Sequence, residues 1–346
     1  MALRAAQARR IAAATAFGGG GLTLLAASTV ALLYLQARIA ARAIGITPWK
    51  RPRVDGVYGV GGGEPLTLVM MGDSTAAGFA VDDPRQTPPV QIASGLSAAA
   101  DRPVRLRDVS RVGATSRGLA AQLERVRGQR VDLAVVLIGA NDVIGRIRPA
   151  DAAAHLREVV RELVASGAAV VVATCPDLGT VQPIPQPLRA VARRASRQMA
   201  AAQTVAVVEE GGSTVALGDL LAEEFLRYPD EMFGPDRFHP SARGYARAAT
   251  VVLPALCAAL GLLPEPVEPQ PEQAEVLPVD RAAAAAVEQP GSEVRQAGAA
   301  DGRGPRGLWA RLLRRGTAPA GDDSTSETDS NSVKVAPGAS DRSRVG

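Results

Sequence analysis

The chain has 346 residues, which allows one large domain or two small ones, and with 47% apolar but only 3% aromatic residues we expect a core packed mainly from Val, Leu, Ile and Ala. The net charge of +4 is small for this length, and the arginines form no dense basic block interleaved with aromatic residues, which argues against nucleic-acid binding. With two cysteines and two histidines, the chain has neither a disulfide framework nor ligands spaced for a zinc site.

An apolar run without any charged residue covers residues 11–35, with arginines on both sides. Because about 20 apolar residues cross the hydrocarbon core of a bilayer, we expect residues 1–45 to hold a single-pass membrane helix. A cleaved signal peptide, cut near residues 26–28, is the alternative. More cations follow the run than precede it, and the positive-inside rule then slightly favours a cytoplasmic location for the rest of the chain.

Five segments have the pattern of strands. Residues 66–71, 131–138, 168–173 and 204–208 are short apolar runs, and residues 104–109 alternate between apolar and polar side chains. Segments with helical spacing of apolar residues separate or follow them, at 89–100, 116–127, 151–165, 186–202 and 242–260. This alternation predicts an α/β domain with a doubly wound parallel sheet over residues 64–263, preceded by a linker at 46–63. Pro254 is expected to kink or split the last helix.

The composition changes after residue 263, where Pro, Glu, Gln, Ser, Asp and Gly become frequent. Such segments bury too little apolar surface to offset the loss of chain entropy, so residues 264–346 are predicted to be a disordered tail. Within it, residues 308–315 have the pattern of a short amphipathic turn. They would be either a contact with a membrane surface or an isolated apolar stretch.

Two turns that follow predicted strands carry polar side chains. Ser74 lies in the glycine-flanked stretch 72–78, directly after the first strand, and Asn141 lies in the stretch 139–142, directly after the third. Ligands bind at the carboxyl edge of an open parallel sheet, where a helix start favours an anion and an Asn side chain can donate to an oxyanion. Ordinary turn and capping chemistry is the alternative for both stretches.

A third polar stretch, residues 236–241, opens the last predicted helix. A serine hydroxyl becomes a good nucleophile when a base takes its proton, and histidine is the usual base near neutral pH. His239 follows Asp236 by three positions, close enough for the carboxylate to orient the imidazole, whereas His155 lies in a helix that looks exposed. His239 is therefore the candidate base.

Taken together, these stretches resemble the SGNH/GDSL hydrolase superfamily. The family's blocks match Gly72–Ser74, Gly113, Gly139–Asp142 and Asp236–Pro240, in the family's order, within residues 66–260. Each block alone is weakly specific, but four blocks in order, each at a predicted sheet edge, are strongly specific. Thr75 stands where the family more often has Leu, so the packing beside the serine is expected to differ.

The resemblance implies a flavodoxin-like three-layer α/β/α fold and a Ser-His-Asp triad. Ser74 would be the nucleophile, His239 the general base and Asp236 the group that orients it. The backbone N–H groups of Ser74 and Gly113 and the side chain of Asn141 would form the oxyanion hole. Neither a metal nor an organic cofactor is implied.

The resemblance also implies hydrolysis of carboxylic esters through a covalent acyl-enzyme, as in esterases, lipases, lysophospholipases and deacetylases. The substrate would be a small ester, a lipid or an acylated sugar. Two alternatives are an acyltransferase acting on envelope glycans or lipids, and a non-catalytic membrane scaffold. We expect the loops at residues 179–187 and 230–235 to build the substrate pocket.

Overall fold

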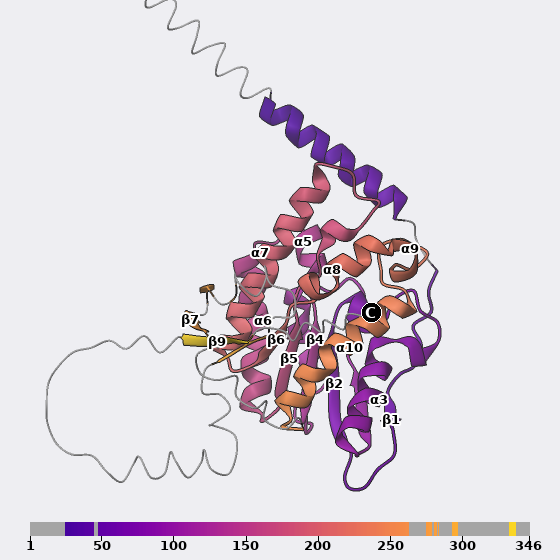
Figure 1. Cartoon of the computed structure of the whole chain (residues 1–346), viewed down its shortest axis with the longest axis vertical. Coiled ribbons are helices and arrows are strands. Elements are labelled where there is room, and N and C mark those ends of the chain that lie inside the picture. The colour runs from indigo at the N-terminus through magenta and orange to yellow at the C-terminus, as the bar shows by residue number, and fades with distance from the viewer. Residues whose placement is uncertain are drawn as a thin grey trace, which may run out of the picture.

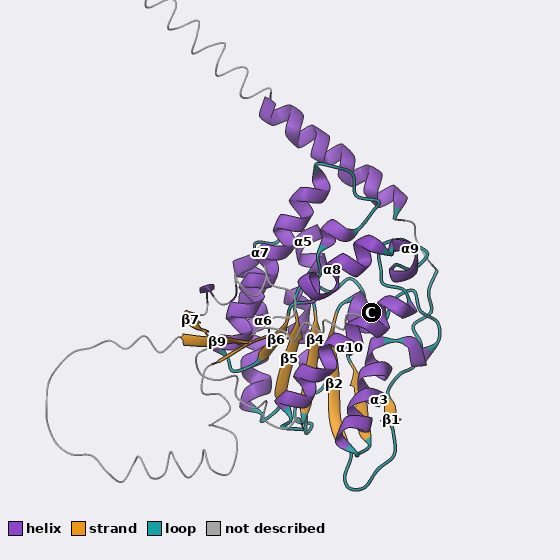
Figure 2. Ribbon diagram, in the orientation of Figure 1, coloured by secondary structure: helices purple, strands orange, loops and turns teal. Residues whose placement is uncertain are grey.

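A twisted sheet forms the centre of the domain. The computed structural model describes residues 25–44, 48–262, 275–278, 280–281, 283, 293–296 and 332–336. Five strands run parallel in the order β3-β2-β4-β5-β6 (Figures 1 and 2). Their bounds are Leu66–Gly72 for β2, Val104–Asp108 for β3, Leu133–Leu137 for β4, Ala169–Ala173 for β5 and Ser213–Val215 for β6. The first four agree with the predicted strands.

Helices cover both faces of this sheet. One face carries α3 (Pro88–Ala100) and α10 (Ala242–Ala259), which lie in front of the strands in Figure 1, and the other carries α4 (Leu119–Glu124), α6 (Pro149–Ala165) and α7 (Leu188–Glu209). Along β2, Leu68 and Met70 belong to one apolar core, while Val69 and Met71 belong to the other. Strands buried on both faces are continuous apolar runs, which is why the sequence reveals them. The three-layer α/β/α arrangement is as predicted.

Shorter elements lie where the parallel strands end. Directly after their strands come α2 (Ser74–Ala77), α5 (Ala140–Ile144), the 3-10 turn η3 (Leu178–Thr180) and α8 (Leu217–Arg227), which α9 (Pro229–Met232) follows. Two further 3-10 turns are η1 (Pro84–Gln86) and η2 (Ser116–Gly118). The carboxyl edge of the sheet therefore carries the polar stretches that the sequence singles out.

The sheet is mixed, so the prediction of a purely parallel sheet was wrong. At one edge β1 (Gly56–Tyr58), within the predicted linker, pairs antiparallel with β3. At the other edge β8 (Glu293–Gln296) pairs antiparallel with β6, and β9 (Ser332–Ala336) and β7 (Glu275–Pro278) follow. These strands have three to five residues, too few to leave a clear pattern in the sequence.

Three of these edge strands, β7, β8 and β9, lie within residues 264–346, which we predicted to be a disordered tail. Much of the remaining segment, including residues 308–315, lies outside the described residues. The pairing of β8 with β6 uses an edge of the central sheet that the parallel strands leave open. A composition that is poor in apolar residues does not exclude such backbone pairing.

Two further differences concern α7 and α10. Residues 204–208, predicted to be a strand, form the last turns of α7, where the buried positions Gln203, Thr204 and Val207 have helical spacing. A β-branched apolar run of five residues does not distinguish strand from helix. The fifth parallel strand is Ser213–Val215 instead. The helix α10 continues through Pro254 without splitting.

A helix over residues 25–43 precedes the domain and runs along the end of it at which α7 begins (Figure 1). Gln36 in this helix is 7% exposed, and its side-chain amide forms hydrogen bonds with the backbone of Gln186 and Leu188. Ala40 belongs to the main apolar core. Among the described residues, no helix is both long and apolar enough to cross a membrane. Residues 1–24, with most of the predicted anchor, lie outside the described residues.

Candidate active site

The structure brings the three predicted triad residues into one hydrogen-bonded series. The Oγ atom of Ser74 lies 3.0 Å from Nε2 of His239, although the two residues are 165 positions apart in the sequence. The opposite ring nitrogen, Nδ1, lies 2.6 Å from Oδ2 of Asp236. Asp236 is 4% exposed and Ser74 is 7% exposed, so both groups are shielded from bulk water. His155, the other histidine, lies in α6 and is not part of this series.

The loop before α10 fixes the orientation of the imidazole. The second carboxylate oxygen of Asp236 accepts hydrogen bonds from the backbone N–H groups of Phe238 and His239, at 3.0 and 2.9 Å. The backbone N–H of Gly234 donates to the His239 carbonyl at 2.8 Å, which closes the loop. Burial alone would raise the pKa of Asp236, but the hydrogen bonds from His239 and Phe238 outweigh it and lower this pKa. The carboxylate is therefore ionised and can orient the imidazole.

The serine stands at the start of α2, immediately after β2. Asp73 caps this short helix, because its Oδ1 accepts from the backbone N–H of Thr75 at 2.8 Å. Burial raises the pKa of Asp73 to about 6, although hydrogen bonds from Thr75 and the nearby His239 act in the opposite direction. Asp73 is thus an acidic group beside the proposed nucleophile. It belongs to the family block Gly72–Ser74, but we assigned it no role of its own from the sequence.

Two of the three predicted oxyanion-hole residues line the same pocket. Ser74 and Asn141 both lie on its wall, together with His239. The Nδ2 atom of Asn141 donates to the Ala114 carbonyl at 3.0 Å. Gly113 adjoins Ala114 in an exposed loop, where its φ of 77° lies in the region that favours glycine, and it does not line the pocket. Gly113 is therefore connected to Asn141 only through Ala114.

The residue after Asn141, Asp142, holds the loop that carries Gly113 and Ser116. Asp142 is fully buried, and its carboxylate accepts hydrogen bonds from the backbone N–H and the hydroxyl of Ser116 at 3.0 to 3.1 Å. Burial raises the pKa of Asp142, and the bonds from Ser116 limit this rise. Asn141 and Asp142 thus attach the end of β4 to the loop that carries Gly113.

Two buried glutamines, which our sequence reasoning missed, hold the ends of the central strands. The amide of Gln122 exchanges two hydrogen bonds of 2.8 Å with the backbone of Gly72, beyond the point where β3 ends. The amide of Gln203 accepts from the Cys175 N–H at 2.8 Å and donates to the Ile138 carbonyl at 3.0 Å. Each side chain continues the backbone ladder where neighbouring strands separate. In the sequence, a glutamine within a helical pattern does not indicate that its amide will bond to the backbone of a strand.

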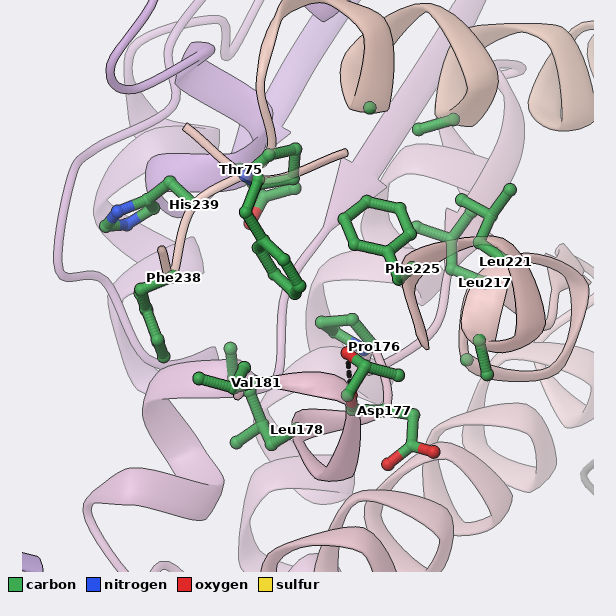
Figure 3. Close-up of a pocket in the computed structure, with 18 of the residues that line it drawn as sticks. Thr75, Pro176, Asp177, Leu178, Val181, Leu217, Leu221, Phe225, Phe238 and His239 are labelled. Carbon is green, nitrogen blue, oxygen red and sulfur yellow. Dashed lines mark hydrogen bonds between the residues drawn. The ribbon is translucent and has the colours of Figure 1, made fainter. Parts of the chain in front are cut away.

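The pocket beside the triad is apolar. Leu178 and Val181 come from η3 and the residue after it, Leu221 and Phe225 come from α8, and Phe233 follows α9. Figure 3 shows Phe225 and Leu221 on the side of the pocket opposite His239 and Phe238. The predicted loops contribute Val181 and Phe233, whereas the contribution of α8 was not predicted. The pocket suits an apolar part of a substrate next to the serine.

Charged groups near the pocket are paired with protein partners. The carboxylate of Asp177 points away from the apolar wall in Figure 3 and forms an ion pair with Arg193. In the part of the chain that the structure describes, no group of three or more His, Cys, Asp or Glu residues is placed to hold a metal ion.

Comparison with known proteins agrees with this arrangement. Residues 70–247 match the model of the GDSL-like Lipase/Acylhydrolase family. The GDSL-like esterase Rv1075c of Mycobacterium tuberculosis is 42% identical over 262 residues, which cover 72% of this chain and 83% of that protein. The chain therefore belongs to the GDSL-like lipase/acylhydrolase family. It is a carboxylic ester hydrolase of the SGNH type, as the sequence predicted.

Several solved structures are also similar to this chain. TesA is 20% identical with a TM-score of 0.44, and the match covers 57% of this chain and 99% of that one. A variant of Axe2, an acetyl xylan esterase from Geobacillus stearothermophilus, is 20% identical with a TM-score of 0.43 and covers 60% of this chain and 99% of its own.

Proposed function

We propose that this enzyme cleaves small apolar carboxylic esters through a covalent acyl-enzyme on Ser74. The observation that carries the proposal is the series Ser74–His239–Asp236 at the mouth of an apolar pocket, with 3.0 and 2.6 Å between successive polar atoms. In the first step the Ser74 oxygen attacks the ester carbonyl while Nε2 of His239 takes its proton. The imidazolium then gives this proton to the leaving alcohol.

In the second step water replaces the alcohol. His239 removes a proton from this water, hydroxide attacks the acyl-enzyme, and the proton returns to Ser74 as the acid leaves. Asp236 remains ionised throughout and holds Nδ1 in its protonated form. Each proton is thus taken and returned by the same imidazole.

The oxyanion of both steps would be held by the Ser74 N–H and the Asn141 amide. Ser74 opens α2, and the first N–H groups of a helix have no partner within it. Asn141 has two amide hydrogens and directs one to Ala114, so the other can face the substrate oxygen. One such donor stabilises a transition state by about 3–4 kcal/mol. The N–H of Gly113, the third donor that the resemblance implies, belongs to the residue before Ala114, whose carbonyl Asn141 contacts.

The ester's acyl chain would occupy the apolar pocket. Its walls include Leu221, Phe225 and Phe233, which favour an apolar acyl chain, and the carboxylate of Asp177, which also lines the pocket, is paired with Arg193. The alcohol part would then leave toward solvent on the His239 side, where the imidazole is 16% exposed.

The test is hydrolysis of p-nitrophenyl acetate and longer p-nitrophenyl esters by the full chain, beside Ser74→Ala and His239→Ala. Both substitutions should lower kcat by at least about a thousandfold without loss of helical circular dichroism. His155→Ala is the matched control and should change kcat less than twofold, because this second histidine belongs to α6 and is not part of the series. Turnover that survives Ser74→Ala, or a folded wild type that hydrolyses none of the esters, would contradict the proposal. Adding an alcohol separates hydrolysis from transfer, since a transferase forms a new ester.

We also propose that the N-terminal segment holds the enzyme at a membrane. The helix over residues 25–43 exposes Leu25, Leu32, Leu35 and Ile39, whose spacing places them along one side. The apolar residues 11–24 precede it without any charge. The full chain should stay with membranes after a carbonate wash, and a version lacking residues 2–24 should be released. Release of the full chain itself would count against this location.

A further inference from the structure

Two aromatic rings, those of Trp49 and Phe79, connect the segment before the domain to the candidate base. The centroid of the Trp49 ring lies 5.0 Å from that of Phe79, and the Phe79 centroid lies 4.3 Å from that of His239. Trp49 belongs to the stretch that we predicted to be a linker, and it precedes the first strand. The linker therefore contacts a residue that touches the imidazole.

The position of Phe79 depends on contacts at both ends of a short turn. The hydroxyl of Tyr245, a fully buried residue of α10, donates to the Phe79 carbonyl at 2.9 Å. The indole N–H of Trp49 donates to the Val81 carbonyl at 2.9 Å. Between them Ala80 has a φ of 69°, a conformation that is strained for any residue except glycine and persists only where its surroundings hold it. The Trp49 bond is one of the hydrogen bonds that hold this turn, beside those from the Phe79 and Val81 N–H groups to the Ser74 and Gly78 carbonyls.

The imidazole of His239 is enclosed by two phenyl rings. Phe79 packs on it with an angle of 44° between the ring planes, and Phe238 meets it almost edge-on, at 85°. The hydrogen bonds to Ser74 and Asp236 define the one ring orientation in which both nitrogens are engaged. Removing a ring from this enclosure frees space into which the imidazole can turn and water can enter.

We propose that Trp49 is a positioning residue for His239 and acts through Phe79. The proposal rests on the proposed role of His239 as general base. Trp49 touches neither Ser74 nor the pocket, so its effect passes through the ring contact and the turn at residues 79–81. The segment before the domain is in this way part of the catalytic arrangement as well as a connection to the N-terminal helix.

The kinetic test uses the full chain and soluble p-nitrophenyl esters. Trp49→Ala should lower kcat about five- to tenfold with KM changed less than twofold. The energy of one aromatic contact is modest, but its loss would misorient the imidazole that takes the proton. Trp49→Phe keeps a ring against Phe79 and should recover most of the loss. Phe79→Leu should lower kcat at least as much as Trp49→Ala. The double variant should be no slower than Phe79→Leu alone, because Trp49 acts through Phe79.

Ile44→Ala is the matched control for a loss of packing in the same segment. Ile44 is half-buried against the main apolar core and makes no ring contact. Its replacement should leave kcat within twofold of wild type. Additive losses in the Trp49 and Phe79 double variant, or an equal loss in Ile44→Ala, would overturn the proposal in favour of a general effect on stability.

A second measurement does not need turnover. The chain has only two histidines, so a histidine-labelled sample gives two sets of imidazole NMR signals, and His155→Gln identifies those of His239. Trp49→Ala should shift the His239 ring signals, because the ring current of Phe79 changes as Phe79 moves, while Ile44→Ala should leave them in place. Unshifted His239 signals in folded Trp49→Ala would refute the proposal. If wild type hydrolyses no ester, the proposed function fails separately, and these signals still decide whether Trp49 positions His239.

Discussion

Replacing Gln203 by leucine tests how the carboxyl edge of the sheet is held. The two residues have similar size, but leucine removes the hydrogen bonds to the Cys175 N–H and the Ile138 carbonyl, both of which are buried. Each buried backbone group left without a partner costs about 1–3 kcal/mol. Since leucine regains some apolar contact, we expect the free energy of unfolding to fall by about 3 kcal/mol.

The same substitution should also impair catalysis. Ile138 is followed by Gly139, whose φ of 132° and close approach to Cys175 leave no room for a side chain, and then by α5 with Asn141. A shift of the Ile138 carbonyl would therefore move Asn141, and we expect kcat/KM for p-nitrophenyl acetate to fall about tenfold, or 1.4 kcal/mol. The Gln203 amide thus connects the stability of the sheet edge to the geometry of the proposed oxyanion hole.

The assay is urea unfolding followed by circular dichroism, together with initial rates of the folded protein. Gln129→Leu is the control, because this glutamine is exposed and its side-chain amide bonds to the Arg125 carbonyl, at 3.1 Å. It should change the free energy of unfolding by less than about 0.5 kcal/mol. If Gln203→Leu were equally mild, the glutamine would not be holding the strand ends and the reasoning would be refuted.

Asp73→Asn should stabilise the protein at pH 8 by about 2–3 kcal/mol, because burial raises the pKa of Asp73 to about 6 and ionisation above that pH opposes folding. The folded chain holds this proton more tightly than the unfolded chain, so the gain in the free energy of unfolding should shrink as pH falls from about 6 to about 4. Urea unfolding at pH 8 and at about pH 4 measures this gain. An equal gain at the two pH values would contradict the reasoning. Phe225→Ala should raise kcat/KM for longer p-nitrophenyl esters relative to the acetate by enlarging the pocket, and an unchanged chain-length profile would place the acyl chain elsewhere. Burial raises the pKa of the Cys175 and Cys257 thiols, so neither should react with Ellman's reagent before unfolding, and thiol release in native buffer would contradict their burial.

The sequence predicts the parts of this protein in which chemistry and burial leave strong patterns. Three of the five parallel strands, β2, β4 and β5, are nearly continuous apolar runs, because helices cover both faces of the sheet, and β3 shows an alternating pattern. The polar stretches around Ser74, Asn141 and Asp236–His239 follow strands or open a helix, and parallel strands end at one edge, so their meeting could be expected.

Other contributions to the site cannot be predicted in this way because they depend on tertiary contacts between distant residues. Gln122 is one polar residue in a helical pattern, and only the fold places its amide against Gly72. Trp49 lies in a stretch without periodicity, and its contact with Phe79 spans 30 positions of the chain. The short strand β1 pairs with β3 although β2 lies between them in the sequence. A single sequence carries no record of such pairings.

The separation of Ser74 and His239 along the chain has a consequence for synthesis. The parallel strands can assemble as the chain lengthens, since β2 and β3 come first and β4, β5 and β6 then each add to a strand already made. His239 arrives 165 residues after Ser74, beyond the last of these strands. A growing chain therefore carries the serine in a nearly finished sheet before it carries the residue proposed to activate it. On the proposed mechanism, ester hydrolysis reports the docking of α10, and a population of chains is as active as the fraction that has completed that step.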